Sequence, residues 1–282
     1  MTAPVTTAGW RGDLRRLTRS VSFDIGAVIV LFWVTCALFG SHLVPYDPFA
    51  DDLLNSLMPP SSDHWFGTDQ LGRDVFSRVI VGARDILTVA PIATALSTIL
   101  GTALGLTMGY FGGVIDEALS RIVDAVLALP TVIVALLALT ALGTSTITVM
   151  VVIAFSFAPV IARTVRSAVL AERGFDYVAA AELRRENAFY ILFVEILPNV
   201  LPPILVEATV RLGYAIFTVA TLSFIGFGIQ PPSPDWGLSI SANYGMIGGG
   251  FWWTVVFDGA AIASLIIGIN LIADGIEGLR HD

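Results

Sequence analysis

The residues that most often carry out catalysis are few in this sequence and do not form a recognisable catalytic pattern. The three histidines, His42, His64 and His281, are scattered, with no HExxH motif and no second ligand at helical spacing. No serine lies in a GxSxG elbow, and all 15 cationic residues are arginine. Because a P-loop needs a lysine to reach the β- and γ-phosphates of ATP, this chain cannot be a P-loop ATPase by itself. We therefore expect no catalysis and no metal site in this chain.

A different chemistry is indicated by charged residues inside long apolar stretches. Glu207 and Arg211 are one helical turn apart, about 6 Å along a helix axis, and can neutralise each other. Asp124 lies three residues from Arg121 and can be paired in the same way. Since an ionised side chain costs roughly 2.5–3.5 kcal/mol at the bilayer centre, such residues invite a functional interpretation. We interpret Glu207 and Arg211 as a structural pair near the inner membrane surface, in preference to a gate or path role.

The elements that hold these charges are predicted to be membrane helices. The 282 residues are 55% hydrophobic and 13% charged, with a mean hydropathy of +0.80, which leaves too little polar surface for a water-soluble fold. A bilayer core of roughly 30 Å needs about 20 apolar residues of helix, because backbone groups in lipid must be satisfied within the segment. Six stretches meet this requirement, at about 24–44, 86–109, 124–142, 147–163, 203–225 and 252–273.

The third and fourth stretches belong to one almost uncharged tract, 125–162, that is too long for a single crossing. The turn-like residues 143–146 interrupt it and predict a tight hairpin of two spans. The first stretch could instead be a secretory signal that follows a basic tail. Its apolar run exceeds the usual length of about 7–15 residues and no small-x-small cleavage site follows before Pro45, so a membrane helix is preferred.

The arginine distribution predicts that both termini are cytoplasmic, since cytoplasmic loops carry the arginine excess. The loop 226–251 has no arginine, and the three arginines of 45–85 are mixed with aspartates. The arginines assigned to the cytoplasmic side are Arg11, Arg15, Arg16 and Arg19 in the N-terminal tail, Arg166, Arg173, Arg184 and Arg185 in the segment 164–202, Arg163 at its edge, and Arg280.

The segment 164–202 is the largest one predicted to face the cytoplasm, and it is too polar to span a membrane. Its alanine-rich and charged stretches are broken near 184–187, which predicts two short surface helices that end at Pro198 before the next span. Two interpretations remain open from this pattern. The segment is either an amphipathic connector or the handle by which a cytoplasmic motor moves the spans.

Part of this segment resembles the "EAA" coupling loop of bacterial ABC importer permeases. The resemblance is carried by Asp176-Tyr177-Val178, Ala180-Ala181 and, at the expected spacing, Ile196-Leu197-Pro198-Asn199. It implies that the loop docks in a cleft of an ATPase subunit. Ala179 replaces the usual glutamate and Arg185 the usual glycine, so we expect the turn at Arg185 to differ in shape, because glycine is the default where φ is positive. The residues assigned to ATPase coupling are Phe175, Asp176, Tyr177, Ala180, Ala181, Glu182, Leu183, Arg184 and Arg185.

Further segments narrow the resemblance to the C-type subunit of dipeptide, oligopeptide and nickel permeases. They are HWFGTDQLGRDVFSRVIVGARDIL at 64–87, YFGGVIDEALSRIVDAVLALP at 110–130, LSFIGFGIQPPSPDWG at 222–237, and the closing NLIADGIEGLRHD. Their order along the chain covers most of residues 45–282 and is far more specific than one glycine-rich loop.

The first of these segments contains the outer-loop motif of that family. Its glycines do not have the spacing of a phosphate-binding loop. We expect a structured outer loop in which exposed ion pairs contribute about 0.3–0.5 kcal/mol each. The resemblance implies contact with a substrate-delivering protein. The motif residues are Gly67, Thr68, Asp69, Gly72, Arg73 and Asp74, and the ion pairs are expected among Asp69, Arg73, Asp74 and Arg78.

Together these observations predict an all-α membrane protein with six transmembrane helices in the type I ABC importer fold, both termini being cytoplasmic. Residues 1–23 would form a cytoplasmic tail, and 24–85 the first transmembrane helix with a long extracellular loop. Residues 86–282 would form the core permease domain, with five transmembrane helices and the cytoplasmic coupling loop at 164–202.

The resemblance implies a permease subunit of an ATP-driven, binding-protein-dependent importer of di- and oligopeptides in the bacterial plasma (inner) membrane. Its implied partners are a homologous permease subunit, two cytoplasmic ATPase subunits or domains that bind ATP and Mg²⁺, an extracellular substrate-binding protein, and membrane lipid. No cofactor on this chain is expected, and no basic patch suggests nucleic acid. The alternatives are import of nickel chelates or other peptide-like solutes, or a stand-alone secondary transporter.

Overall fold

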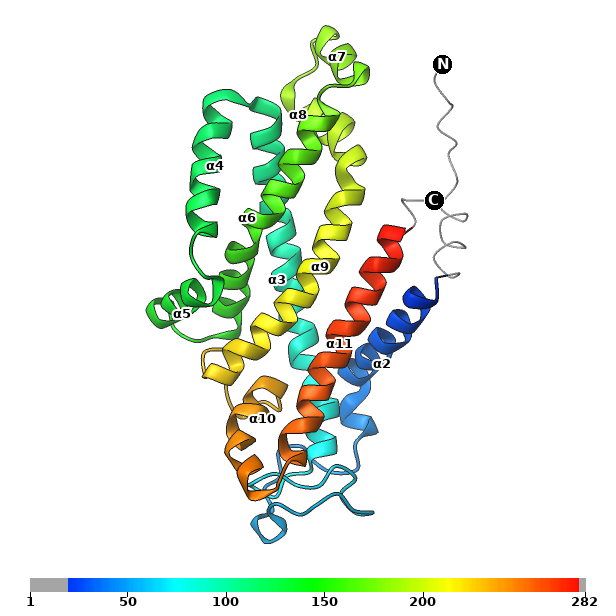
Figure 1. The fold of residues 1–282 in the computed structure, drawn as a ribbon, viewed down its shortest axis with the longest axis vertical. Helices are drawn as coiled ribbons and strands as arrows, with labels where there is room; N and C mark the ends of the chain where they lie inside the picture. Colours follow the sequence, from blue (N-terminus) through cyan, green and yellow to red (C-terminus); the bar gives the residue numbers. More distant parts are fainter. Residues whose placement is uncertain (1–19, 279–282) are drawn as a thin grey trace.

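The computed structural model describes residues 20–278, and this part of the chain is almost entirely helical (Figure 1). Its only β pairing is an isolated bridge between Thr68 and Asp74. Arg11, Arg15, Arg16, Arg19, Arg280 and His281 lie outside the described residues. The α-helices are α2 (Val21–Leu43), α3 (Val75–Phe111), α4 (Gly113–Leu127), α5 (Thr131–Leu142), α6 (Thr146–Glu172), α7 (Asp176–Leu183), α8 (Ala188–Tyr190), α9 (Leu197–Ile225), α10 (Trp236–Asn243) and α11 (Trp253–Gly278). The shorter elements are 3-10 turns at Leu53–Asn55 and Tyr244–Gly249, and a π-helical segment at Ile191–Ile196.

Five helical stretches in the described residues are long and apolar enough to cross a membrane. They are α2, α3, α6, the stretch Ala188–Ile225 that ends in α9, and α11. A sixth span is present if α4 and α5, which meet at an angle of 89°, are counted as one broken crossing. The prediction of a helical membrane protein is therefore confirmed, with five to six candidate spans.

The predicted span 124–142 is not one continuous helix, because the break between α4 and α5 falls inside it. α4 ends at Leu127, Ala128 caps it, and α5 starts again after Pro130. Proline has no amide hydrogen and disfavours the helical conformation of the residue before it, so the helix is interrupted here. α5 has 12 residues, about 18 Å of helix, which is too short to cross the membrane alone.

Several helices extend beyond the predicted spans. α3 begins at Val75 rather than near 86 and has 37 residues, about 55 Å of helix. α6 continues to Glu172, so the predicted loop 164–202 begins inside a helix, and Pro198 lies in the first turn of α9 instead of ending a surface helix. The predicted spans are too short because they were limited to uncharged stretches. The helices α3 and α6 continue through charged residues at their ends.

The most extensive helix–helix contact among the described residues is the one between α3 and α6, and three glycines of α3 lie in it. Gly101, Gly105 and Gly109 lie four residues apart on α3, against Ile161, Val165 and Val169 of α6. A Cβ atom added at Gly105 would lie 2.6 Å from the Cβ of Val165 and 2.7 Å from the carbonyl oxygen of Ala162. Such small residues let helix backbones approach closely, which is how helices associate in lipid.

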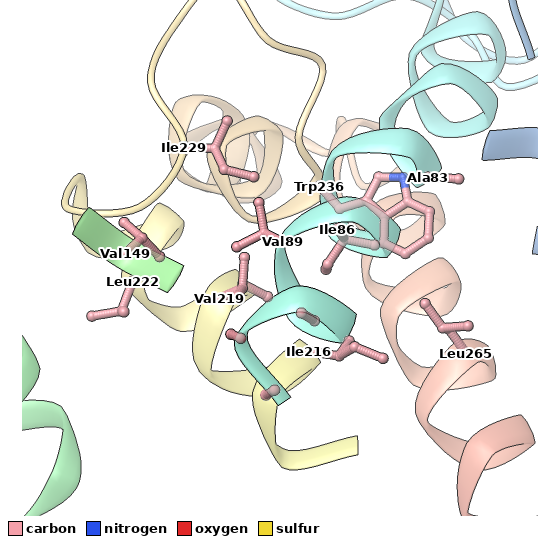
Figure 2. Close-up of a cluster of buried hydrophobic side chains, with 14 of the residues drawn as sticks. Ala83, Ile86, Val89, Val149, Ile216, Val219, Leu222, Ile229, Trp236 and Leu265 are labelled. Carbon is pink, nitrogen blue, oxygen red and sulfur yellow. The ribbon is translucent and has the colours of Figure 1, made fainter. Parts of the chain in front are cut away.

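A hydrophobic cluster connects α2, α3, α5, α6, α9, α10 and α11, and part of it is shown in Figure 2. Trp236 of α10 is fully buried, and its indole nitrogen donates to the carbonyl oxygen of Val79 at 2.8 Å. Trp33 of α2 packs edge-on against Trp236, with ring centroids 4.8 Å apart, and donates to Ser264 Oγ at 3.0 Å. The labelled members of this cluster are Ala83, Ile86, Val89, Val149, Ile216, Val219, Leu222, Ile229, Trp236 and Leu265.

The molecule has two distinct ends (Figure 1). We call them the α7 end and the α10 end after the short helix at each. At the α7 end, α3, α4, α6 and α9 extend beyond the ends of α2 and α11. At the α10 end, α10 lies beside the long loop 44–74 that joins α2 to α3.

Candidate functional sites

The short helix α7 is attached to the rest of the α7 end through one face. Val178 and Ala181 are buried in a cluster with Val165 and Val169 of α6 and Ile196. The other face of α7 is exposed: Leu183 has 85% of its surface accessible and Phe175 has 55%. This exposed side of α7 projects from the α7 end and combines the apolar Leu183 and Phe175 with the charged Asp176 and Glu182, so a partner could reach it.

Two polar contacts hold α7 on its neighbours. The Tyr177 hydroxyl donates to Glu172 Oε2 of α6 at 2.7 Å. Burial and this hydrogen bond raise the pKa of Tyr177 to about 12, so the hydroxyl keeps its proton. Arg184 donates to Glu195 Oε1 at 2.9 Å, in the π-helical segment that leads into α9. A displacement of α7 would therefore act on both α6 and α9.

The turn after α7 has the backbone conformation that usually needs glycine. Arg185 has φ of +59°. Its amide donates to Glu182 O at 2.9 Å and that of Glu186 donates to Ala181 O at 3.2 Å, which is the Schellman arrangement at a helix C-terminus. The expectation that Arg185 would change the shape of this turn is therefore wrong. The arginine adopts the left-handed conformation at a cost of about 1–2 kcal/mol.

Of the residues predicted for coupling, the structure places most on the exposed surface. Tyr177 is half-buried and Ala181 fully buried, so these two anchor the segment instead of presenting it. The exposed ones are Phe175, Asp176, Ala180, Glu182, Leu183, Arg184 and Arg185.

The outer-loop motif forms a buried polar cluster at the α10 end. Asp69 is 1% exposed; it accepts from the amides of Leu71 and Arg73 at 2.8 and 3.0 Å, and from Arg73 Nε at 2.7 Å. Asp74 is the N-cap of α3 and accepts from the Ser77 amide at 2.8 Å. The expectation of exposed ion pairs is wrong, because loop 44–74 folds over these charges and covers them.

Arg78 and the motif glycines fix how this loop sits. Arg78 is 4% exposed and donates to Pro48 O at 3.0 Å and to Ser239 Oγ of α10 at 3.3 Å. Gly67 and Gly72 both have φ of +75°, and a Cβ at Gly72 would lie 1.7 Å from Asp52 O. Thr68 Oγ1 donates to Asn55 O at 2.5 Å. The motif therefore acts as the framework of the loop, and its spacing permits no phosphate-type site.

One charged residue predicted to lie inside a span has a different partner from the one expected. Asp124 of α4 pairs with Arg163 of α6, and not with Arg121, which pairs with Glu117 instead. The sequence places Arg163 at the edge of a loop, and the pair is not predicted for this reason. In the structure Arg163 lies inside helix α6, beside α4. Arg166, also on α6, makes a two-pronged contact with Asp116, both distances being 2.6 Å.

The Glu207–Arg211 pair is present on α9, with Arg211 Nε 2.6 Å from Glu207 Oε1. Both side chains are mostly buried, at 17% and 19% accessible, and Thr164 of α6 donates to Glu207 Oε2 at 3.2 Å. The Arg211 guanidinium lies over the ring of Tyr214, with its Cζ 4.9 Å from the ring centroid.

Asp258, which was not singled out from the sequence, is a buried ionisable residue in a span. Asp258 of α11 is 2% exposed, and its Oδ1 has no hydrogen-bond partner in the part of the chain that the structure describes. The signal was present in the sequence, since the predicted span 252–273 contains this aspartate. Within residues 20–278, no group of three or more His, Cys, Asp and Glu side chains is placed to hold a metal ion.

Comparison with protein families gives two matches. The model described as "Binding-protein-dependent transport system inner membrane component" matches residues 101–279. The model described as "N-terminal TM domain of oligopeptide transport permease C" matches residues 10–60. The first match contains α4 to α11, with α7 and the charged pairs, and the second contains α2.

Individual relatives match over nearly the whole chain. The probable D,D-dipeptide transport system permease protein DdpC of Escherichia coli strain K12 is 38% identical over 255 residues, covering 90% of this chain and 85% of the relative. The dipeptide transport system permease protein DppC of Alkalihalophilus pseudofirmus is 38% identical over 268 residues, covering 95% and 88%. The glutathione transport system permease protein GsiD of Pectobacterium atrosepticum is 35% identical over 272 residues, covering 95% and 89%.

A solved structure has the same fold. A chain of the MetNI methionine ABC transporter in an inward-facing conformation matches with a TM-score of 0.57 and 22% identity. The match covers 72% of this chain and 95% of the solved one.

Proposed function

The chain belongs to the family of binding-protein-dependent transport system inner membrane components, and we propose that it is a permease subunit of an ATP-driven importer of di- and oligopeptides. The relatives whose names specify dipeptides support this substrate class. In this role the chain forms half of a path across the bacterial inner membrane, beside a homologous permease subunit. It performs no chemistry itself; ATP and Mg²⁺ bind to two partner ATPase subunits or domains.

The observation that carries this proposal is the construction of α7. It exposes the apolar Leu183 at the projecting end of the molecule and is tied to α6 by Tyr177 and to the start of α9 by Arg184. An ATPase that binds α7 and moves it would therefore displace α6 and α9 together. Rigid movement of packed helices is an established way to switch access between the two sides of a membrane.

This assignment also gives the orientation of the chain. The α7 end, with Arg173, Arg184 and Arg185 exposed, would be cytoplasmic, in agreement with the positive-inside rule. The α10 end would then face outward, and its loop 44–74 would meet the substrate-binding protein. Arg73 and Arg78 of that end are paired with Asp69, and Arg73 also with Asp51, so they do not argue for the opposite orientation.

Other substrates remain within the proposal. A glutathione permease is 35% identical to this chain, so peptide-like solutes and chelates are the alternative cargo. A stand-alone secondary transporter is disfavoured, because it would leave the exposed Leu183 and Phe175 at α7 without a partner.

The test is recovery of the complex with a single change on α7. Leu183→Asp places a charge on a side chain that is 85% exposed, so folding should be unaffected while ATPase docking is lost. The matched control is Leu54→Asp, since Leu54 is 96% exposed at the opposite end. Co-purification of the ATPase with the wild type and with Leu54→Asp, but not with Leu183→Asp, is expected. Purification of the wild-type chain as a lone, transporting unit would contradict the proposal.

A further inference from the structure

Arg211 is an ionisable side chain deep within the candidate membrane span Ala188–Ile225. It lies 14 residues from each end of the 29-residue helix α9 (211 − 197 and 225 − 211), which is about 21 Å from either end. A charge at such a depth costs roughly 2.5–3.5 kcal/mol unless it has a partner or a wet surface. The surroundings of Arg211 therefore decide what it can do.

The contacts of Arg211 fix the plane of its guanidinium and leave its two terminal nitrogens without a hydrogen-bond partner among the described residues. Nε donates to Glu207 Oε1 at 2.6 Å, and the group lies over the Tyr214 ring. Within residues 20–278, neither terminal nitrogen of Arg211 has a hydrogen-bond partner. Glu207 is itself held by Thr164, which donates to its second oxygen at 3.2 Å. The guanidinium is thus oriented, with its terminal N–H groups available to a ligand.

Two hollows lie at the ends of this chain of contacts. The first, about 600 Å³, is between α6 and α9 and is lined by Thr164, Ser167 and Pro203, among others. The second, about 270 Å³, is between α9 and α11 and is lined by Gly213, Tyr214 and Asn270, among others. The contacts from Thr164 through Glu207 and Arg211 to Tyr214 connect the two hollows along α9.

The second hollow is lined mainly by apolar side chains, among them Val210, Phe217 and Ile266, but it also contains two polar ones. Tyr214 is 55% exposed, and Asn270 of α11 is exposed with no side-chain hydrogen bond to the described residues. A Cβ at Gly213 would lie 3.4 Å from Asn270 Oδ1, so the amide lies directly against α9. An unpaired amide in hydrocarbon is costly, and such residues normally face a protein interior or a water-filled cavity.

We propose that Arg211 binds the carboxylate end of a short peptide during its passage along α9. The planar guanidinium matches a carboxylate in a two-pronged contact, and the Asn270 amide supplies a further donor in the hollow that Tyr214 lines, next to Arg211 along α9. Glu207 is a positioning residue: it orients Arg211 and offsets its charge, so the peptide is held weakly enough to leave. This inference rests on the proposed function and assigns the contacted group of the substrate. It also replaces the interpretation of Glu207 and Arg211 as a purely structural pair.

The experiment compares two probes in the reconstituted complex of both permease subunits, the ATPases and the binding protein. The probes are dialanine and its C-terminal amide, which lacks the carboxylate. The double variant Glu207→Gln/Arg211→Gln removes both charges together, so no unpaired charge is left in the membrane. The matched control is Glu117→Gln/Arg121→Gln, an exposed pair at the same i,i+4 spacing on α4. Uptake of each probe and ATP hydrolysis stimulated by the binding protein are measured for all three proteins.

Because all proteins use the same binding protein, a change in the ratio of the two uptake rates belongs to the permease. We expect the α9 double variant to assemble and hydrolyse ATP like the wild type, while its preference for dialanine over the amide falls about tenfold. The α4 double variant should keep the wild-type ratio. An α9 double variant that keeps the wild-type ratio and rate overturns the inference and supports a structural pair. A wild-type complex that imports neither probe, or that forms without an ATPase, contradicts the proposed function instead.

Discussion

Tyr177 and Glu172 are joined by a hydrogen bond of 2.7 Å that links α7 to the last turn of α6. The donor is a phenol whose pKa is raised to about 12 by burial and by this contact, so it does not ionise in any physiological range. The acceptor is a carboxylate, and hydrogen bonds to charged groups contribute about 1.5–3 kcal/mol. The attachment of α7 to α6 therefore uses a donor that keeps its proton throughout the physiological pH range.

Tyr177→Phe should loosen α7 without unfolding the protein. The ring keeps its packing, but the loss of one charge-assisted hydrogen bond should raise amide hydrogen exchange in 176–183 by about tenfold. Hydrogen exchange followed by mass spectrometry measures this directly. Tyr190→Phe is the control, since the Tyr190 hydroxyl has no hydrogen bond within residues 20–278. Equal exchange in the two variants would show that the hydroxyl contributes nothing to the attachment of α7.

Arg185→Gly should make the end of α7 more stable. Glycine adopts a φ of +59° without steric cost, whereas arginine pays about 1–2 kcal/mol for it, part of which glycine loses again in unfolded-chain entropy. A net gain of about 1 kcal/mol corresponds to about fivefold slower exchange of the amides that close the turn. Arg185→Ala is the control, because it removes the charge but keeps the strain. If alanine slows exchange as much as glycine does, charge and not backbone strain governs this turn.

How far the sequence predicts this structure depends on the kind of signal. The spans follow from composition, because lipid imposes long apolar helices whatever their packing. The break at Pro130 was visible in the sequence but was outweighed by the apolar run around it. In contrast, the pairing of Asp124 with Arg163 joins residues 39 positions apart. The burial of Asp69 depends on the folding of a whole loop over the motif. No local pattern encodes such contacts.

In the candidate sites, too, some features are predicted by the sequence and others depend on packing between distant residues. The segment around α7 is predicted only by its resemblance to a family, and the sequence does not separate its anchoring residues Tyr177 and Ala181 from its exposed ones, because that depends on how α7 packs. Asp258 was overlooked although it stands inside a predicted span, where any ionisable residue carries information. The backbone at Arg185 shows that a turn can keep its conformation after the residue that favours it has been replaced.

Gly105→Ala should weaken the contact between α3 and α6. The added Cβ would lie 2.6 Å from Val165 Cβ and 2.7 Å from a backbone oxygen of α6, so the helices must move apart. Overpacking of this kind costs about 1–3 kcal/mol. Gly259→Ala on α11 is the matched control, since nothing lies within 4 Å of its added Cβ and helix propensity improves. Thermal unfolding in mild detergent should therefore give a lower midpoint for Gly105→Ala alone, and equal midpoints would contradict the close-packing argument.

Asp235→Asn should remove a pH dependence of stability that comes from the α10 end. Asp235 is the N-cap of α10 and is fully buried, and burial, followed by the nearby charge of Asp85, raises its pKa from 3.8 to about 6. A carboxyl group with a raised pKa holds its proton more tightly in the folded state than in the unfolded one. Its contribution to stability is therefore complete at low pH and is lost as the pH rises from about 4 to about 6.

The size of this effect follows from the shift, since each pKa unit corresponds to about 1.4 kcal/mol, or up to about 3 kcal/mol for Asp235. Asparagine keeps an oxygen for the amide of Leu238, which the Asp235 carboxylate contacts at 2.9 Å, and it carries no charge at any pH. The stability of Asp235→Asn relative to the wild type should therefore increase between pH 4 and pH 7, as measured by unfolding at several pH values. Other titrating groups change both proteins alike and cancel in the difference. Parallel stability curves for the two proteins would show that Asp235 is already ionised at pH 4 in the folded state, which would require a hydrogen-bond donor at its second oxygen.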